Sequence, residues 1–146
     1  MPTAARLTAA LVLVMAGLAA VYFVLPLLPD SQPRDLLYPI TLGFAAVVGW
    51  MFIGGRAGDG IVNAAFNGLT GGFLWTLATL FAFGVGRMWQ LAFRRQYQDP
   101  FDAVLAVFEE TVLYGQYVLN YNVLLSVAIG ALLAGILAEL ADKRFP

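Results

Sequence analysis

Four long stretches without a charged side chain constrain this chain more than any other feature. They run over residues 7–29, 36–55, 60–86 and 111–138. A helix of about 20 apolar residues is long enough to cross the hydrocarbon core of a bilayer. Hydrophobic residues make up 61% of the chain and charged residues only 12%, a balance typical of membrane proteins rather than globular ones. The sequence therefore predicts an all-α membrane protein with four transmembrane helices.

The ends of these stretches define the expected spans, about 7–28, 36–55, 67–86 and 121–139, in a single membrane domain of residues 1–146. Pro26 and Pro29 end the first span, because proline has no amide hydrogen to donate. Arg87 closes the third, because arginine at a helix centre costs about 2.5–3.5 kcal/mol on the insertion scale. Residues before 67 are expected to be an interfacial lead-in. With four spans both termini lie on one side, and the nearly balanced positive charges lean toward the cytoplasm.

The first apolar stretch has an alternative interpretation as a cleaved signal peptide. Gly17-Leu18-Ala19-Ala20 supplies the small residues that a cleavage site needs. The apolar run continues through Leu25, however, and is longer than the hydrophobic region of most signal peptides. This favours a retained membrane span.

An amphipathic helix is predicted over residues 100–117, between spans three and four. Its apolar residues recur at helical spacing, and they are Phe101, Val104, Leu105, Phe108, Val112 and Leu119. Asp102, Glu109 and Gln116 lie on another face. A one-sided helix of this kind suits the membrane–water interface. The alternative is that the segment is the frayed start of span four.

Small residues recur on one face of the third and fourth spans. Gly68 and Gly72 lie in the third, and Gly130 and Ala134 lie in the fourth. Such stripes let helix backbones approach closely where lipid provides no hydrophobic driving force. They indicate helix packing within the chain, with self-association as the alternative.

The most polar stretch joins spans two and three, and it contains Gly54, Gly55, Arg56 and Gly58. Free amides in a glycine-rich turn, together with a guanidinium, suit an oxyanion. These four residues are therefore a candidate anion contact. The alternative is that Arg56 is simply a topology anchor at a membrane boundary.

Other polar side chains have simpler interpretations. Glu139 and Lys143 are four residues apart and form an ordinary helix pair. Asn63, Asn67 and Thr70 share one helical face, where interhelical hydrogen bonds are expected and a substrate path is the alternative.

Residue types absent from the chain exclude several functions. It contains no cysteine and no histidine, so it has no thiol, no thiolate metal site and no ordinary haem ligand. The net charge of −1 offers no basic face for nucleic acid. We expect no catalytic residues, no cofactor and no metal. The expected partners are the lipid bilayer and either another membrane protein or a second copy of this chain.

Several short blocks resemble the TrgA family, small membrane proteins of alphaproteobacteria associated with tellurite resistance. The blocks are Met1-Pro2-Thr3-Ala4-Ala5-Arg6-Leu7, Gly49-Trp50, Gly54-Gly55-Arg56-Ala57-Gly58, Asn67-Gly68-Leu69-Thr70, Arg94-Arg95, Tyr97, Pro100, Ala103-Val104-Leu105, Val107-Phe108 and Tyr114-Gly115. They extend over nearly the whole chain. The resemblance implies an integral protein of the bacterial inner membrane. It supplies no catalytic motif and no site residue.

Three functions compete on this basis. The first is a non-enzymatic inner-membrane protein that contributes to tellurite tolerance, as the resemblance implies. The second is an accessory or assembly subunit of a larger membrane complex. The third is a small oligomeric oxyanion exporter, which should carry charge inside the membrane facing a cavity. Arg87 and Glu139 both lie at span ends, which disfavours the exporter.

Overall fold

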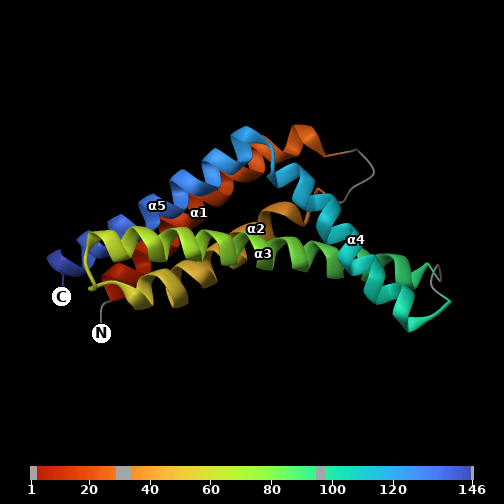
Figure 1. The fold of residues 1–146 in the computed structure, drawn as a ribbon, viewed down its shortest axis with the longest axis horizontal. Helices are drawn as coiled ribbons and strands as arrows, with labels where there is room; N and C mark the ends of the chain where they lie inside the picture. The colour runs from red at the N-terminus through yellow and green to blue at the C-terminus, as the bar shows by residue number, and fades with distance from the viewer. Residues whose placement is uncertain (1–2, 29–33, 95–97, 146) are drawn as a thin grey trace.

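The computed structural model describes residues 3–28, 34–94 and 98–145. In these residues the chain forms five α-helices and no strand, which confirms the predicted all-α class (Figure 1). The elements are α1 (Thr3–Val24), a 3₁₀ turn η1 (Leu25–Leu27), α2 (Leu37–Val48), a π turn η2 (Gly49–Ile53), a 3₁₀ turn η3 (Gly54–Arg56), α3 (Ile61–Phe93), α4 (Pro100–Val118) and α5 (Tyr121–Arg144).

Four of the described helical segments are long and apolar enough to cross a membrane: Thr3–Leu27, Leu37–Arg56, Ile61–Phe93 and Tyr121–Arg144. The third is longer than the sequence predicted. The expected lead-in before residue 67 is part of α3 itself, which starts at Ile61 directly after Gly60. Gly60 has a φ of 100°, outside the helical region, so the chain turns there and not at residue 67.

Local capping explains where several helices begin and end. α1 gives way to the 3₁₀ turn that contains Pro26; Pro29, predicted to share this role, lies outside the described residues. Asp99 accepts a hydrogen bond from the Phe101 amide at 3.3 Å, which caps α4. The Asn120 side chain accepts one from the Asn122 amide at 3.2 Å and separates α4 from α5.

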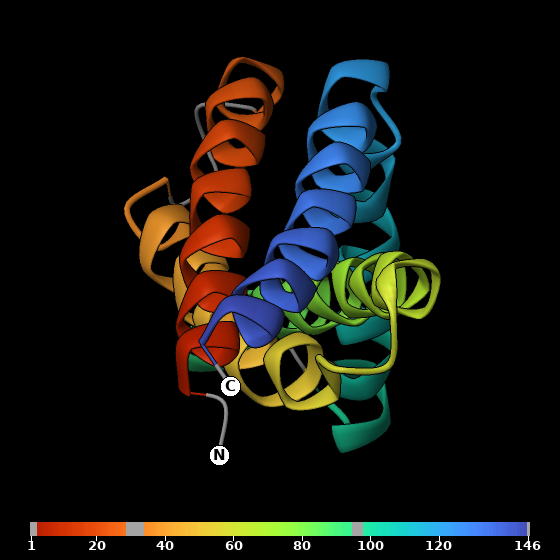
Figure 2. The same ribbon diagram turned by 90° about the vertical axis from the view of Figure 1, so that its left-hand side faces the viewer.

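α5 packs against both α1 and α3, and it runs alongside α1 (Figures 1 and 2). α2 packs against α1, and α4 covers the C-terminal half of α3. The two termini lie at the same end of the molecule (Figure 1). Viewed from that end, α1 and α5 run side by side while α3 is seen nearly end-on (Figure 2).

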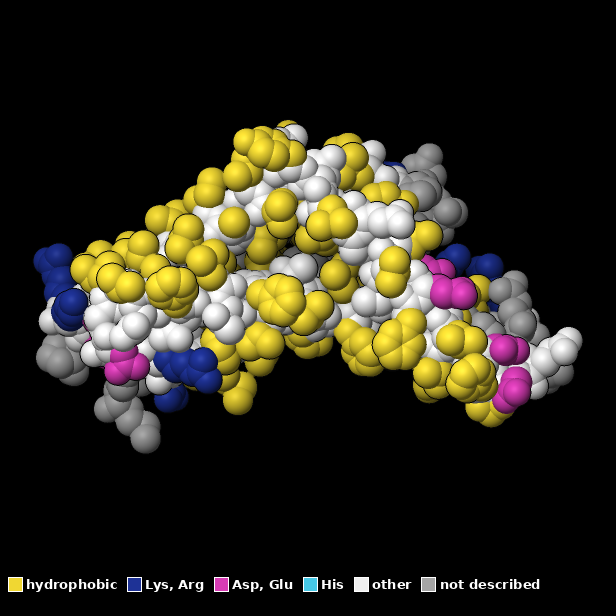
Figure 3. Space-filling model, viewed as in Figure 1, with side chains coloured by type: hydrophobic (Ala, Val, Ile, Leu, Met, Phe, Trp, Pro, Cys, Tyr) yellow, Lys and Arg dark blue, Asp and Glu magenta, His cyan; other side chains and the backbone are white. Residues whose placement is uncertain are grey.

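Small side chains make up much of the interior, and many large ones face outward. Ala9 and Ala134 are fully buried, whereas Met15 is 65% and Phe73 is 63% exposed. Hydrophobic side chains cover the face seen in Figure 3, and charged side chains gather toward the two ends. An apolar surface of this extent does not suit water, and small residues at helix contacts are typical of membrane bundles. The chain is a multi-pass integral membrane protein.

Trp75 connects three helices in the middle of this interior. Its side chain is only 2% exposed and packs in a cluster with Leu13 of α1 and Ala45 of α2. The indole Nε1 donates a hydrogen bond to the Thr41 carbonyl of α2 at 3.0 Å. A buried indole N–H needs a partner, and this bond fixes α2 relative to α3.

α4 contacts α3 through a different face from its predicted apolar stripe. Val107 and Tyr114 are buried against α3, and the Tyr114 ring lies 5.4 Å from the Phe83 ring. The predicted stripe faces away from the bundle, with Phe101 66% and Phe108 60% exposed. α4 is therefore apolar on its outer face as well, as expected of a helix in contact with lipid.

Single cysteines provide a test of the topology, because the chain has none of its own. Positions 3 and 145 should react with a membrane-impermeant maleimide from one side of sealed vesicles. Position 98, which is exposed between α3 and α4, should react only from the other side. Labelling of positions 3 and 145 from opposite sides would contradict the four-span arrangement.

A second test concerns the placement of α4 at the membrane surface. Replacing Phe101 and Phe108 by Asp should make the segment before and within α4 more sensitive to protease in vesicles, because two outward apolar anchors are lost. Replacing Val107 by Asp should instead destabilise the α3–α4 contact. If the double replacement of Phe101 and Phe108 leaves cleavage unchanged, the placement of α4 at the membrane surface is wrong.

Candidate functional site

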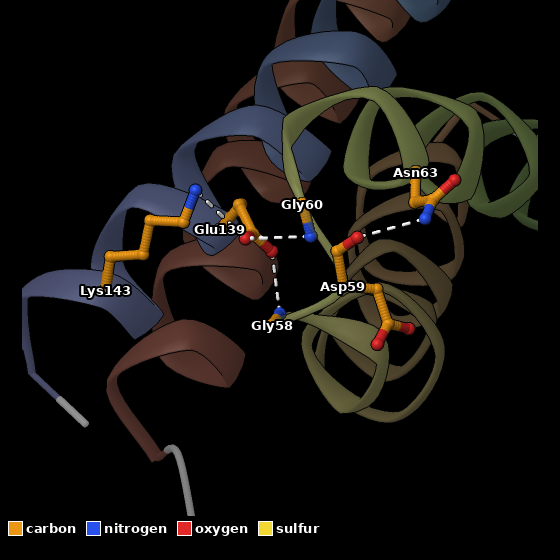
Figure 4. Close-up of polar contacts among 6 residues, drawn as sticks. All are labelled: Gly58, Asp59, Gly60, Asn63, Glu139 and Lys143. Carbon is orange, nitrogen blue, oxygen red and sulfur yellow. Dashed lines mark hydrogen bonds and ion pairs between the residues drawn. The ribbon is translucent and has the colours of Figure 1, made fainter.

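The glycine-rich loop between η3 and α3 binds a carboxylate from α5. The Gly58 amide donates a hydrogen bond to Glu139 Oε2 at 2.6 Å, and the Gly60 amide donates to Glu139 Oε1 at 3.1 Å (Figure 4). Gly58 and Gly60 have φ values of 112° and 100°, which only glycine adopts without strain. These conformations allow two amides to converge on one carboxylate.

The Glu139 side chain carries an ionisable carboxyl group and is nevertheless fully buried, with 0% exposed. Lys143 Nζ lies 3.4 Å from its Oε1, one helical turn further along α5 (Figure 4). The Lys143 side chain is 54% exposed and links the buried carboxylate to the surface. Two amides and one ammonium group therefore compensate the carboxylate, which would otherwise be costly to bury. The contact locks the loop onto the C-terminal half of α5.

The polar residues at the start of α3 bond locally. Asn63 Nδ2 donates to the Asp59 carbonyl at 3.0 Å, and Thr70 Oγ1 donates to the Phe66 carbonyl at 2.9 Å. Both side chains are exposed. The expectation of interhelical hydrogen bonds is wrong for these two residues, because a carbonyl one turn away is within closer reach. Asn63 instead joins the loop to the first turn of α3 (Figure 4).

The four candidate anion-contact residues lie in different environments. Gly54 is buried against Arg6 of α1, and Gly55 is exposed. The Arg56 guanidinium lies over the Phe52 ring, 4.0 Å from its centroid. The Gly58 amide is bonded to Glu139. The glycine-rich turn therefore does hold a carboxylate, but one from its own chain.

The four predicted packing residues face other helices of the same chain. A Cβ on Gly72 would lie 2.5 Å from the Ala131 Cβ, and one on Gly68 would overlap the Ala131 carbonyl oxygen. Gly130 lies against Ala16 of α1, and Ala134 is fully buried. These stripes bring both α3 and α1 into close contact with α5.

An ion pair joins α3 and α4 at the far end of the molecule. Arg87 Nε lies 3.8 Å from Glu110 Oε1, and both side chains are about four-fifths buried, with 22% and 21% exposed. Burial, with the nearby Glu110 carboxylate, raises the pKa of Tyr114 on α4. Asp99, directly before α4, caps the start of that helix. The Glu110 and Asp99 carboxylates thus have separate structural partners.

A small cavity of about 60 Å³ lies at the centre of the bundle. Its lining contains residues of all five helices, among them Trp75, Phe83 and Tyr114, and no charged residue of the described chain. The buried Thr79 hydroxyl, which also lines it, has no hydrogen-bond partner among the described residues. A space of this size accommodates a few water molecules rather than a hydrated oxyanion path.

Glu139 was predicted only to pair with Lys143, and its contact with the glycine-rich loop was not predicted. Its signal was present: it is the acidic residue that ends an apolar stretch, at the same membrane boundary as a loop with free glycine amides. No family model, no curated protein and no solved structure matches the chain.

Proposed function

We propose that this chain is a non-enzymatic protein of the bacterial inner membrane that contributes to tellurite tolerance as an accessory subunit, without binding the oxyanion itself. The observation that carries the accessory role is the contact between the glycine-rich loop and Glu139. The loop is the part of the chain best suited to an oxyanion. Two of its amides, however, already donate hydrogen bonds to the Glu139 carboxylate of the same chain. The tolerance role comes from the resemblance to the TrgA family.

The chemistry of the chain supports a role without electron transfer. Reduction of tellurite needs an electron source, and biological sources use thiolates, flavin, haem or iron–sulfur centres. Without cysteine or histidine the chain cannot supply a thiolate or the usual axial ligands of haem. Its contribution then comes through a partner or through the membrane.

The exporter alternative has less support. The lining of the central cavity is uncharged over the described residues. The buried acidic groups Glu139 and Glu110 are each paired with a cation close to an end of the bundle. Transport of a charged species needs compensating groups along its path, and none of the described charges lies midway.

The tolerance of a strain that depends on this gene tests the proposal. Arg56→Gln should leave tolerance unchanged at equal protein level, because an accessory subunit needs no oxyanion contact at this loop. Arg94→Gln, at the opposite end of the molecule, is the matched control. A selective loss of tolerance in Arg56→Gln would favour direct oxyanion contact.

Isolation of the tagged protein in mild detergent tests the accessory role directly. One membrane complex should co-purify in stoichiometric amount. Purified protein in liposomes should reduce tellurite with NADH or a dithiol no faster than protein-free liposomes do. Faster reduction would contradict the non-redox proposal, and a chain that purifies alone would contradict the accessory one.

A further inference from the structure

Two arginines from separate elements lie on neighbouring backbone segments at the end of the molecule that carries both termini. A Cβ added to Gly54 would lie 2.9 Å from the Arg6 Cγ and 3.0 Å from its Cβ, so η3 packs directly on the first turns of α1 at Arg6. Arg56 follows two residues later in the same 3₁₀ turn. Gly54 therefore brings two guanidinium-bearing residues onto neighbouring backbone segments.

Neither arginine is paired with a carboxylate in the described part of the chain. The Arg6 Nε atom is buried and has no hydrogen-bond partner there. An unsatisfied buried donor is costly, more so on a charged group, and a bound acceptor would remove that cost. Glu139, the buried carboxylate at this end, is already bonded to Gly58, Gly60 and Lys143. The site thus has positive charge and donor capacity that the described chain does not use.

The Phe52 ring orients the second arginine. The Arg56 guanidinium lies 4.0 Å from the ring centroid, a geometry that holds the flat group while leaving its N–H donors at the edges free. Arg56 is exposed, and Arg6 is half-buried. Two guanidinium groups carried by neighbouring backbone segments suit an anion with several acceptor oxygens.

The surroundings identify a lipid as the source of that anion. Arg6 directly precedes the uncharged stretch of α1, and Arg56 directly follows that of the second span. Both therefore lie at headgroup depth. The adjacent apolar spans carry outward side chains, with Leu7 53% and Met51 73% exposed, and such side chains can contact an acyl chain. Basic pockets between transmembrane helices are known sites for anionic headgroups.

We propose that Arg6 and Arg56 form a binding site for the phosphate headgroup of an anionic phospholipid, between α1 and the end of the second span. The proposal requires only that the chain spans a membrane. It is independent of the role in tellurite tolerance, which the strain and co-purification experiments test separately.

Native mass spectrometry of the protein in mild detergent tests this site, with phosphatidylglycerol and phosphatidylcholine as probes. The wild type should retain phosphatidylglycerol in preference to phosphatidylcholine. Arg56→Gln and Arg6→Gln should each lower phosphatidylglycerol retention about fivefold, because one basic residue near the membrane surface strengthens binding to an anionic lipid by about that factor. Arg94→Gln at the other end should retain the lipid as the wild type does.

The remaining outcomes separate the lipid from other anions. Inorganic phosphate added at millimolar concentration should not displace the lipid, because it lacks the acyl chains. Complete displacement would overturn the lipid assignment in favour of a free-anion site. Equal phosphatidylglycerol retention in the wild type and in Arg56→Gln would overturn the site itself. Because Arg56 is exposed, this variant tests the proposal even where Arg6→Gln fails to fold.

Discussion

Replacing Glu139 by Ala is expected to be among the most damaging single changes in this chain, with a loss of about 3 kcal/mol of stability in detergent. The substitution removes the acceptor of both the Gly58 and the Gly60 amide. It also leaves a void beside α5 where the fully buried side chain was. The loop would lose its attachment to α5, so the thermal unfolding temperature should fall and protease should cleave between η3 and α3.

Two matched variants isolate the cause. Glu139→Gln keeps one acceptor oxygen but turns an NH₂ group toward an amide donor, so its loss should be intermediate. Lys143→Gln removes only the exposed partner of the ion pair and should cost less than about 1 kcal/mol. If Glu139→Ala and Lys143→Gln unfold at the same temperature, the carboxylate–amide contact does not hold the loop.

The helices were predictable because their signals are local. Uncharged stretches of bilayer length predict spans whatever their neighbours are, and Asp99-Pro100 begins α4 through a cap and a proline that act within one turn. The amphipathic pattern of α4 was also visible in the sequence. Its contact face was not, because both the outer stripe and the face on α3 are apolar, and periodicity alone cannot say which one meets a helix.

The site was only partly predictable because its contacts are distant in sequence. The glycine-rich loop suggested an anion, and the structure supplies the carboxylate of Glu139 from 79 and 81 residues away. Likewise Arg56 stood out as a loop cation, whereas nothing local indicated that Gly54 would pack its turn against Arg6. Spacing identifies groups that need partners, but the partner follows only from how the helices pack.

Replacing Gly68 by Ala is expected to separate α3 from α5. The added methyl group would overlap the Ala131 carbonyl oxygen and lie 3.1 Å from the Gly135 Cα, both of which are backbone atoms. Backbone atoms in a helix cannot rotate away, so the helices must move apart, at a cost of about 1–3 kcal/mol for one inserted methyl group. Gly68→Leu should be worse, because its larger side chain requires a wider separation.

Gly86 provides a control within the same helix. A Cβ added there meets no heavy atom within 4 Å, and alanine stabilises a helix interior by up to about 1 kcal/mol relative to glycine. Gly86→Ala should therefore unfold at or above the wild-type temperature, while Gly68→Ala unfolds below it. Equal unfolding temperatures for the two variants would mean that α3 and α5 are not in backbone contact at Gly68. The small-residue stripe would then be free for another helix, and the self-association alternative would regain its support.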